Sequence, residues 1–420
     1  MHSGDLSGIR AAVTPTLSPA ELIEYLADLG GALLGAGCPT HRLELALAQI
    51  GALEGYRVDA FAVPTGLFLS LSGGDLPQPL MRMARVKDWG TDLERLALID
   101  RIFNDVLARD MTLAQARRLL DRIEDKPPTY TVGLRVLATA GACGAAAVFF
   151  RGGWTEIGIA AFGGLLLATV RELLGFKPRT ALLGDFVGAM IAALTAWAAS
   201  ALMPEVAREV IVLAVIIPLV PGVALTNGIA ELVYRNLVSG AAKLMEALVI
   251  FLSIVFGIAV VVAFESLVGS PPTQVLARGE PGLLMNAGAL LVASAAFAII
   301  FSVPKNLVGA ALLVGAVGWI VTAFGVRYLP ASLSAFTASL VVASIANGIA
   351  RFTQRPAQIF VVPGLVLLVP GSFGFISLES FLRGDFLNGA AKGFEMFLTA
   401  GAIVIGLLVA NVLVPPRKLL

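Results

Sequence analysis

The sequence is short of cysteine, histidine and charge, and each shortage excludes a class of protein. Two cysteines in 420 residues cannot form a disulfide framework. Charged residues make up 14% of the chain and hydrophobic residues 57%, whereas an average soluble protein has about 25% charged residues. This balance excludes a disordered chain and argues against a purely soluble fold. The formal net charge of +1 provides no basic field, so we expect no nucleic-acid partner.

The two histidines, His2 and His41, lie outside the long apolar segments of the sequence. An enzyme inside a bilayer would therefore lack histidine for acid–base or metal chemistry. Cys38 and His41 are near enough in sequence to share a metal, but two ligands do not make a site, and a helix start with surface polar groups explains them better. We expect no metal, no cofactor and no enzymatic activity.

Charge is concentrated at the start of the chain, which divides the sequence into a soluble part and a membrane part. Residues 1–130 hold 30 of the 59 Asp, Glu, Lys and Arg residues. The break falls at Asp125-Lys126-Pro127-Pro128, a charged and proline-stiffened joint typical of a domain boundary. The first ten residues contain no apolar signal-peptide core, and together with the long polar start this favours a cytoplasmic domain over 1–130.

Hydrophobic periodicity predicts an α+β fold for this domain. Apolar residues at helical spacing predict helices at 20–36, 40–53, 91–108 and 112–124. Apolar stretches at 57–62, 67–71 and 80–86 predict strands, and Pro64-Thr65-Gly66 predicts the turn between the first two. Thr91 is expected to be the N-cap of the third helix, with Glu94 completing a capping box.

Ten apolar segments follow the soluble domain. A helix needs about 20 mostly apolar residues to cross a bilayer. The sequence therefore predicts a mainly α, polytopic membrane protein in which about ten transmembrane helices follow the small α+β soluble domain. The segments form two groups of five, in membrane domains at 131–268 and 281–416. They are 132–150, 157–174, 182–203, 210–225 and 244–267 in the first group, and 283–303, 307–326, 333–349, 359–376 and 394–414 in the second.

A shift of 149 residues superimposes the two groups. Pro221-Gly222 matches Pro370-Gly371, and the GAAKxxE motif at 240–246 matches the same motif at 389–395. All five segments of the first group also fall on those of the second, so we interpret the groups as an internal repeat. Because five is odd, the second copy would enter the bilayer from the opposite side, giving two inverted five-helix repeats. With a cytoplasmic N-terminus, the inner loops carry more Lys and Arg than the outer loops, in agreement with the positive-inside rule.

The fourth segment of each repeat contains prolines where a helix should be continuous. Pro218 and Pro221 interrupt the first, and Pro363 and Pro370 the second. Proline lacks an amide donor and clashes with the preceding turn, so each segment should break into two half-helices. Free amides at the start of a half-helix near Val223 would suit a substrate carboxylate. We predict a substrate site that comprises Pro221, Gly222, Thr226, Asn227, Pro370 and Gly371; a kinked helix without a ligand is the alternative.

Ionisable residues inside the apolar segments are a second group of candidates. Asp185 lies near the start of the third segment, and two Lys/Glu pairs at the fifth and tenth segments have the i, i+3 spacing of ion pairs on one helix face. A carboxylate inside the membrane costs several kcal/mol unless it is paired or protonated. For the lysines, anchoring at the membrane interface is the alternative. We predict proton coupling or ion pairing at Asp185, Lys243, Glu246, Lys392 and Glu395.

Several short motifs carry a resemblance to a known family. They are GCPTHRLE at 37–44, VPTGLFLS at 63–70, PLVPG at 218–222, LVSG at 237–240, VPK at 303–305 and VPGLVLLVPG at 362–371. With these motifs the chain resembles the threonine/serine exporter family over nearly its whole length. The two halves are separate chains in some relatives and would be fused here. The resemblance implies a ten-helix, multi-pass inner-membrane protein that exports small hydroxy amino acids, threonine and serine, driven by protons.

The resemblance does not fix which residues bind. The positions that match Thr226 and Asn227 in the second repeat are Phe375 and Ile376, so we expect an asymmetric site. The expected partners are the amino-acid substrate, protons and the lipid bilayer, and assembly into a homo-oligomer stays open. A channel or membrane sensor gated by the N-terminal domain is the alternative function. An intramembrane enzyme would need an acid dyad, and Ser334 stands at the repeat position of Asp185.

Overall fold

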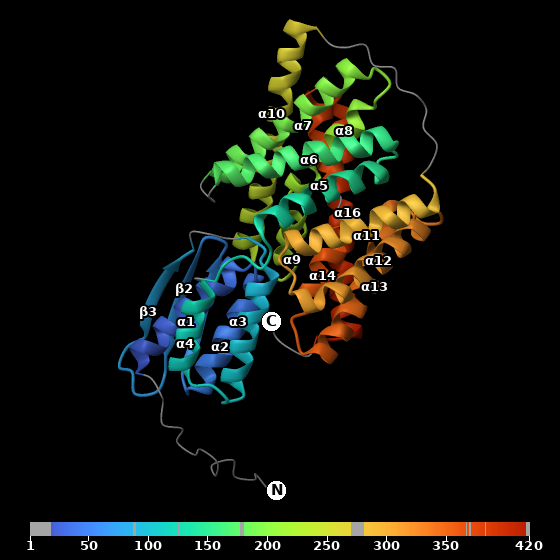
Figure 1. The fold of residues 1–420 in the computed structure, drawn as a ribbon. Helices are drawn as coiled ribbons and strands as arrows, with labels where there is room; N and C mark the ends of the chain where they lie inside the picture. The colour runs from blue at the N-terminus through green and yellow to red at the C-terminus, as the bar shows by residue number, and fades with distance from the viewer. Residues whose placement is uncertain are drawn as a thin grey trace. The chain divides into compact units, whose positions relative to one another are not determined.

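The structure is a computed structural model that describes residues 18–86, 90–124, 126–176, 180–269, 281–366, 368, 371–382 and 384–416. The chain forms two compact units, shown as a ribbon in Figure 1. Of the described residues, 18–86 and those between 98 and 126 belong to the smaller unit. Residues 90–97 and those from 127 onward belong to the larger, helical unit.

The smaller unit contains a three-stranded antiparallel sheet with helices packed on one face (Figure 1). The strands β1 (Arg57–Val63), β2 (Gly66–Ser72) and β3 (Leu80–Arg85) lie side by side in sequence order. Helix α1 (Pro19–Gly35) packs on β2 and β3, and α2 (Thr40–Leu53) packs on β1. Because side chains alternate along a strand, Leu67, Leu69 and Leu71 are buried under the helices. All three predicted strands are confirmed.

Two further helices, α3 (Leu93–Leu107) and α4 (Leu113–Glu124), complete the four helices predicted before residue 125. The prediction of Thr91 as an N-cap is wrong: the carboxylate of Asp92 accepts the hydrogen bond from the Arg95 N–H, at 3.0 Å. Asp can cap a helix as well as Thr, and here it is the residue directly before the first turn. The Glu94 carboxylate accepts a hydrogen bond from the Thr129 hydroxyl.

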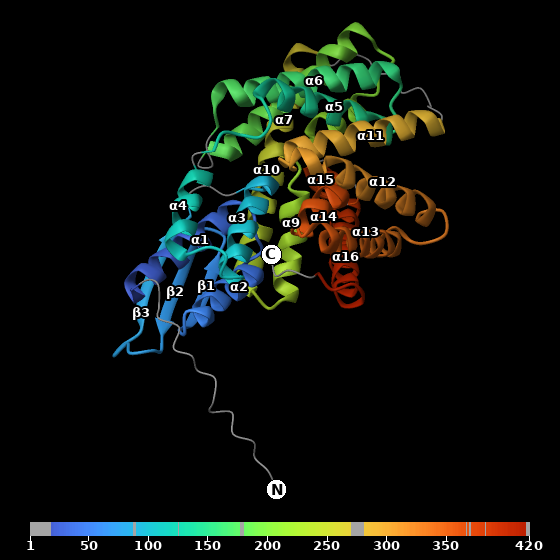
Figure 2. The ribbon, with the colours of Figure 1, turned by 60° about the horizontal axis from the view of Figure 1, so that its bottom comes forward.

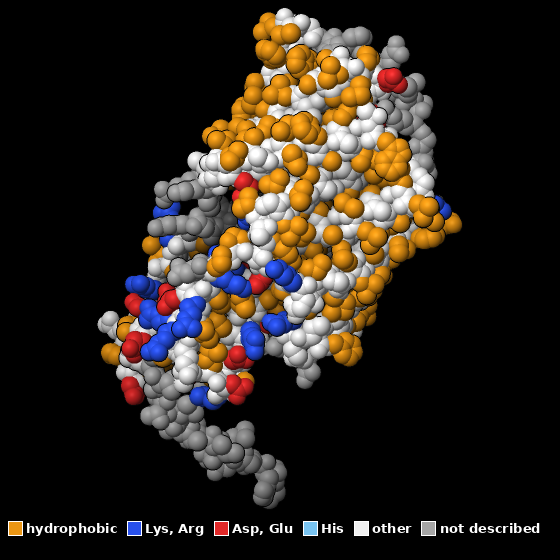
Figure 3. Space-filling model, viewed as in Figure 1, with side chains coloured by type: hydrophobic (Ala, Val, Ile, Leu, Met, Phe, Trp, Pro, Cys, Tyr) orange, Lys and Arg blue, Asp and Glu red, His pale blue; other side chains and the backbone are white. Residues whose placement is uncertain are grey.

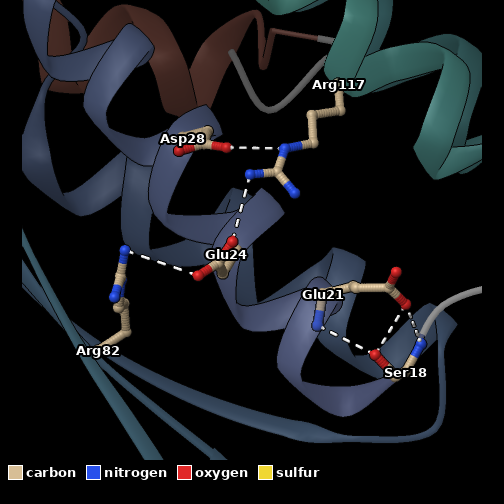
Figure 4. A network of polar contacts seen from close by, with 6 residues as sticks. All are labelled: Ser18, Glu21, Glu24, Asp28, Arg82 and Arg117. Carbon is tan, nitrogen blue, oxygen red and sulfur yellow. Dashed lines mark hydrogen bonds and ion pairs between the residues drawn. The ribbon is translucent and has the colours of Figure 1, made fainter.

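Charged side chains tie α1 to α4 and to β3, as Figure 4 shows. The Arg117 guanidinium lies 3.3 Å from the Glu24 carboxylate and 3.2 Å from that of Asp28. The Arg82 guanidinium lies 3.7 Å from Glu24. Burial raises the pKa of Asp28 although Arg117 lowers it. The network therefore includes a carboxylate that is partly desolvated.

Helices are the only regular secondary structure among the described residues of the larger unit. Most of its helices are apolar and longer than 17 residues, and many of their large hydrophobic side chains are exposed. Figure 3 shows hydrophobic side chains over most of the visible face of this unit, and Lys, Arg, Asp and Glu concentrated on the smaller one. The helices are α5 (Val132–Phe149), α6 (Trp154–Leu174), α7 (Ala181–Leu202), α8 (Arg208–Ile216), α9 (Gly222–Val233), α10 (Leu237–Val268), α11 (Leu283–Ile300), α12 (Val308–Gly325), α13 (Ala331–Thr353), α14 (Gln358–Val366), α15 (Gly371–Leu382) and α16 (Phe386–Leu413).

The helices confirm a mainly helical, multi-pass membrane protein. Within the described residues, 8 helices are long and apolar enough to cross a bilayer, or up to 9 if the bent pair α8–α9 counts as one span. The number of ten therefore stays a prediction. The tenth candidate is the pair α14–α15, and the residues that join this pair include 367, 369 and 370, which lie outside the described residues.

The helices of the two groups begin at matching positions. When 149 is added to the first residue of each helix of the first group, the result falls within two residues of the start of a helix in the second group; this holds for α5, α6, α7, α8, α9 and α10. For α6 the matching helix is the 3₁₀ helix η3 (Lys305–Leu307), which precedes α12. Two close helix contacts involve glycines related by the same shift, Gly257 and Gly406, and their carbonyl partners are 150 residues apart. A Cβ atom at Gly257 of α10 would overlap the carbonyl oxygen of Phe186 in α7, and one at Gly406 of α16 would lie 2.6 Å from the carbonyl oxygen of Phe336 in α13. Only glycine allows these two backbones to approach so closely.

Candidate functional site

The fourth span of the first group is broken at the predicted place. Helix α8 ends at Ile216 and passes into the 3₁₀ helix η2 (Ile217–Leu219), and α9 begins at Gly222. The segments before and after the break, Arg208–Leu219 and Gly222–Val233, are bent by 54°. Val220 and Pro221 lie between them, and the Pro221 φ of −79° and ψ of 47° lie outside the helical region. The prediction that proline breaks this span is confirmed.

The start of α9 has amide groups without an acceptor. Pro221 provides no side-chain cap, and the Gly222 N–H is used by the carbonyl oxygen of Val220, at 2.8 Å. Among the described residues, no hydrogen-bond acceptor faces the N–H groups of Val223 and Ala224. Free N–H groups and the positive end of a helix dipole favour an anion, so this end of α9 can bind a carboxylate.

Thr226 and Asn227 follow in the second turn and differ in what they offer. Thr226 is 4% exposed, and its hydroxyl donates to the carbonyl oxygen of Gly222 at 3.1 Å. Its oxygen can therefore accept a further hydrogen bond but cannot donate one. Asn227 is half-buried, and its side chain forms no hydrogen bond with any described residue. Consecutive helical residues point about 100° apart, so the two side chains do not share one face.

Asp185 belongs to α7, a helix that packs beside this break. The side chain is buried in the first turns of α7, where its carboxylate lies 3.4 Å from the Arg171 guanidinium of α6. One turn further along α7, a Cβ atom at Gly188 would lie 2.9 Å from Leu219 of η2. The predicted acid and the broken span thus belong to one packed group of helices.

Lys243 forms an interhelical ion pair that the sequence did not predict. Its Nζ lies 3.0 Å from the Glu231 carboxylate of α9, and Glu231 is 1% exposed. The Glu231 carboxylate also accepts a hydrogen bond from the Asn236 side chain, at 3.2 Å. The sequence signal for Glu231 is its charge within the half-helix that follows Pro221, four residues after Asn227; it has no i, i+3 lysine partner there.

The second repeat shows the predicted local pair. The Lys392 Nζ lies 2.9 Å from the Glu395 carboxylate, on one face of α16, and 5.3 Å from the centre of the Phe373 ring. Glu246 and Glu395 are both half-buried. Gly371 is the first residue of α15, whereas Pro370 lies outside the described residues. Helix α14 continues across Pro363, so that proline does not break it.

The two halves of the membrane unit meet beside the broken span. Helix α9 packs on α10 and on α16, and α15 packs on α10. Figure 2 shows α9 beside the helices of the second half. Leu225 of α9, Phe251 of α10 and Met396 of α16 share one buried apolar cluster. The second turn of α9 is therefore surrounded by apolar side chains from both halves, which strengthens any polar interaction made at its start.

Two protein-family models match the chain. A family described as "Putative threonine/serine exporter" matches residues 24–265, and one described as "Threonine/Serine exporter, ThrE" matches residues 286–413. The two matches together include the soluble part and both groups of membrane helices. No solved structure matches the chain.

Individual relatives are similar over most of the chain. A protein of Mycobacterium tuberculosis named "Probable threonine/serine exporter" is 25% identical over 89% of this chain and 72% of its own length. The "Threonine/serine exporter" of Corynebacterium glutamicum is 22% identical over 96% of this chain and 86% of its own length. An uncharacterized protein of Schizosaccharomyces pombe is 26% identical over 62% of this chain, and the matched region covers only 35% of that protein. With a family match over more than half of its length, the chain belongs to the threonine/serine exporter family.

Proposed function

We propose that this protein is a secondary transporter of the cell inner membrane that exports threonine and serine by alternating access at its broken helices. The observation that supports it most is the break between α8 and α9, where two amides without an acceptor lie at the start of an otherwise apolar half-helix. An α-amino acid carries a carboxylate that these donors fit. The family of the chain supports the choice of threonine and serine.

The substrate site lies at the break. The substrate carboxylate binds the N–H groups of Val223 and Ala224, and Gly222 allows the close approach because it has no side chain. The ammonium group donates to the Thr226 hydroxyl oxygen, and the Asn227 side chain, on another face of the helix, binds the substrate hydroxyl. Pro221 keeps the backbone open, and Pro370 and Gly371 take the same position in the second repeat.

The repeats are inverted, and the N-terminal domain over 1–130 lies in the cytoplasm. The matching starts of the helices in the two groups support a duplicated unit, and the odd number of spans in each unit requires the opposite orientation. The membrane domains then take up 131–268 and 281–416. The inner excess of Lys and Arg supports this orientation.

Protons drive export through the intramembrane carboxylates. Asp185 is the first candidate because it is buried, has a cationic partner in Arg171 and lies one turn from the helix contact at the break. Glu246 and Glu395 are the matched candidates of the two repeats. Lys392 pairs with Glu395, whereas Lys243, at the same end of α10, pairs with Glu231 of α9. An intramembrane acid is costly, which makes a role in coupling a better explanation than anchoring.

Efflux of labelled threonine from proteoliposomes tests the proposal. We expect saturable efflux that a pH gradient accelerates. Val223→Pro removes one amide donor, and the helix can still form because proline is tolerated in a first turn. This variant should bind threonine about tenfold more weakly, whereas the affinity of Val223→Ala should stay near that of the wild type. Efflux no faster than from empty vesicles would refute the exporter. Flux that does not saturate and ignores the gradient would favour a gated channel instead.

A further inference from the structure

The apolar cluster beside the start of α9 is built from matched positions of the two repeats. Four residues of the first repeat that lie in this cluster or pack against it are Ala224, Leu225, Ala247 and Phe251. The shift of 149 residues takes them to Phe373, Gly374, Met396 and Ala400. All of these matches except Gly374 also lie in the cluster or pack against it. The two repeats therefore contribute the same positions to one cluster.

Gly374 adjoins the same cluster. A Cβ atom at this glycine would lie 2.5 Å from the Phe251 ring and 2.7 Å from the Met396 sulfur, so α15 packs closely against these two side chains. Because position 374 carries no side chain, it leaves room for the Phe251 ring of the other repeat. A large residue of one repeat thus fills the space that a small residue of the other leaves open.

Each matched position carries a large residue in one repeat and a small one in the other. At two of the positions the first repeat has the small residues, Ala224 and Ala247, and the second repeat has Phe373 and Met396. Ala224 provides one of the two free amides, and its side chain is a single methyl group. At these two positions the bulk therefore comes from the second repeat.

A substrate bound as proposed would place its side chain against this cluster. In an α-amino acid the side chain is attached to the carbon next to the carboxylate. A carboxylate on the Ala224 N–H therefore keeps the side chain near the residues that pack with Ala224, which include Phe373 and Met396. The side chains of serine and threonine are short, whereas the isobutyl group of leucine would have to displace side chains that are already packed.

The Phe373 ring is held in place by a cation. The Lys392 Nζ lies 5.3 Å from the centre of this ring and 2.9 Å from the Glu395 carboxylate. A cation at this distance from an aromatic ring attracts it. Lys392 is also one turn before Met396 on α16, so the two side chains that supply the bulk are supported by the same helix.

We propose that Phe373 and Met396 are specificity-determining residues, which close the substrate site from the second repeat and admit only amino acids with side chains about as small as those of serine and threonine. Ala224 and Ala247 keep the matching space open in the first repeat. One repeat thus provides the amides that bind the carboxylate, and the other sets the size limit. This inference rests on the proposed function.

Efflux of labelled threonine and labelled leucine from proteoliposomes that contain the full chain tests the size limit. Phe373→Ala and Met396→Ala should each raise the ratio of kcat/KM for leucine to that for threonine about tenfold, because removing packed side chains makes room for the larger substrate. The control is Phe394→Ala, which removes an exposed phenylalanine of the same helix α16 and should leave the ratio unchanged. An unchanged ratio in both Phe373→Ala and Met396→Ala would overturn the inference.

An exchange of residues between the repeats decides the question if the single variants do not fold. Ala224→Phe combined with Phe373→Ala keeps the volume of the cluster, and such substitutions are tolerated best in a packed core. The exchange puts an aromatic ring beside the free amides, so a protein that elutes from gel filtration like the wild type should export threonine at least tenfold more slowly. Threonine efflux at the wild-type rate, or an exchange variant that does not fold, would show that the two positions do not share one site.

The same vesicles separate this inference from the proposed function. Wild-type vesicles that release threonine no faster than empty ones would refute the proposed function together with the size limit. Saturable threonine efflux by the wild type, with the leucine-to-threonine ratio unchanged in both single variants, would refute the size limit alone.

Discussion

The close approach of α16 to α13 gives a stability prediction with a control in the same helix. A Cβ atom at Gly406 would overlap the Ser339 side-chain oxygen and lie 2.6 Å from the carbonyl oxygen of Phe336. The serine can turn away, but the carbonyl belongs to the backbone of α13. Gly406→Ala must therefore push the two helices apart by about 1 Å, which opens packing along their contact.

The magnitude follows from two opposing effects. Overpacking of a filled contact costs about 1–3 kcal/mol, and replacing glycine by alanine within a helix gains about 1 kcal/mol. At Gly401, five residues earlier in α16, a Cβ atom would meet nothing within 4 Å, so Gly401→Ala shows only the gain. The two variants should differ by about 1–3 kcal/mol in the free energy of unfolding, with Gly401→Ala the more stable.

Unfolding of the purified protein in mild detergent, followed by tryptophan fluorescence, measures this difference. Gly257→Ala provides a parallel test in the first repeat, where the Cβ atom would overlap the Phe186 carbonyl oxygen of α7. We expect Gly257→Ala and Gly406→Ala to unfold earlier than the wild type and Gly401→Ala to unfold at the same point or later. If all three variants unfold together, the close contacts do not exist and the packing described here is wrong.

Three further predictions concern charge and capping. Asp185→Asn should abolish the acceleration of efflux by a pH gradient while the protein still reaches the membrane, and gradient-driven efflux at the wild-type rate would remove Asp185 from the mechanism. Hydrogen bonds from Ser18 hold the pKa of Glu21 below its usual value. The cap of α1 is therefore fully stabilising at a pH above the ordinary glutamate pKa, and it weakens as the pH falls through the lowered pKa. Hydrogen exchange of the amides in the first turn should speed up in acid, and Ser18→Ala should make this exchange fast at every pH. Arg117→Met should lower the stability of the smaller unit by about 1 kcal/mol at low salt, with a loss that shrinks in 1 M salt; a loss that ignores salt would mean that packing rather than charge explains the effect.

Much of the fold could be predicted because the signals are local. The apolar periods placed the helices and strands, and Pro221 marked the break because a proline acts on its own turn. The cap of α3 was assigned to the wrong neighbour, since Thr91 and Asp92 have nearly equal preference for that position. The prediction that Pro363 interrupts its segment is wrong, because α14 continues across this proline.

The contacts between helices could not be predicted from local sequence patterns. Lys243 was expected to be an ion-pair partner along its own helix, and the sequence carries no register that would bring Glu231 of α9 beside it. The close approaches at Gly257 and Gly406 were missed for the same reason, as nothing distinguishes them from glycines such as Gly401 until the neighbouring helix is present. Side-chain types and spacing thus located the broken span, whereas the partners of its charged residues depend on tertiary packing.

The most direct test of the central claim is a structure of the full chain with threonine bound. The account predicts the threonine carboxylate within hydrogen-bond distance of the N–H groups of Val223 and Ala224, at the break between α8 and α9. Threonine bound elsewhere, with these two amides still facing no ligand, would contradict it.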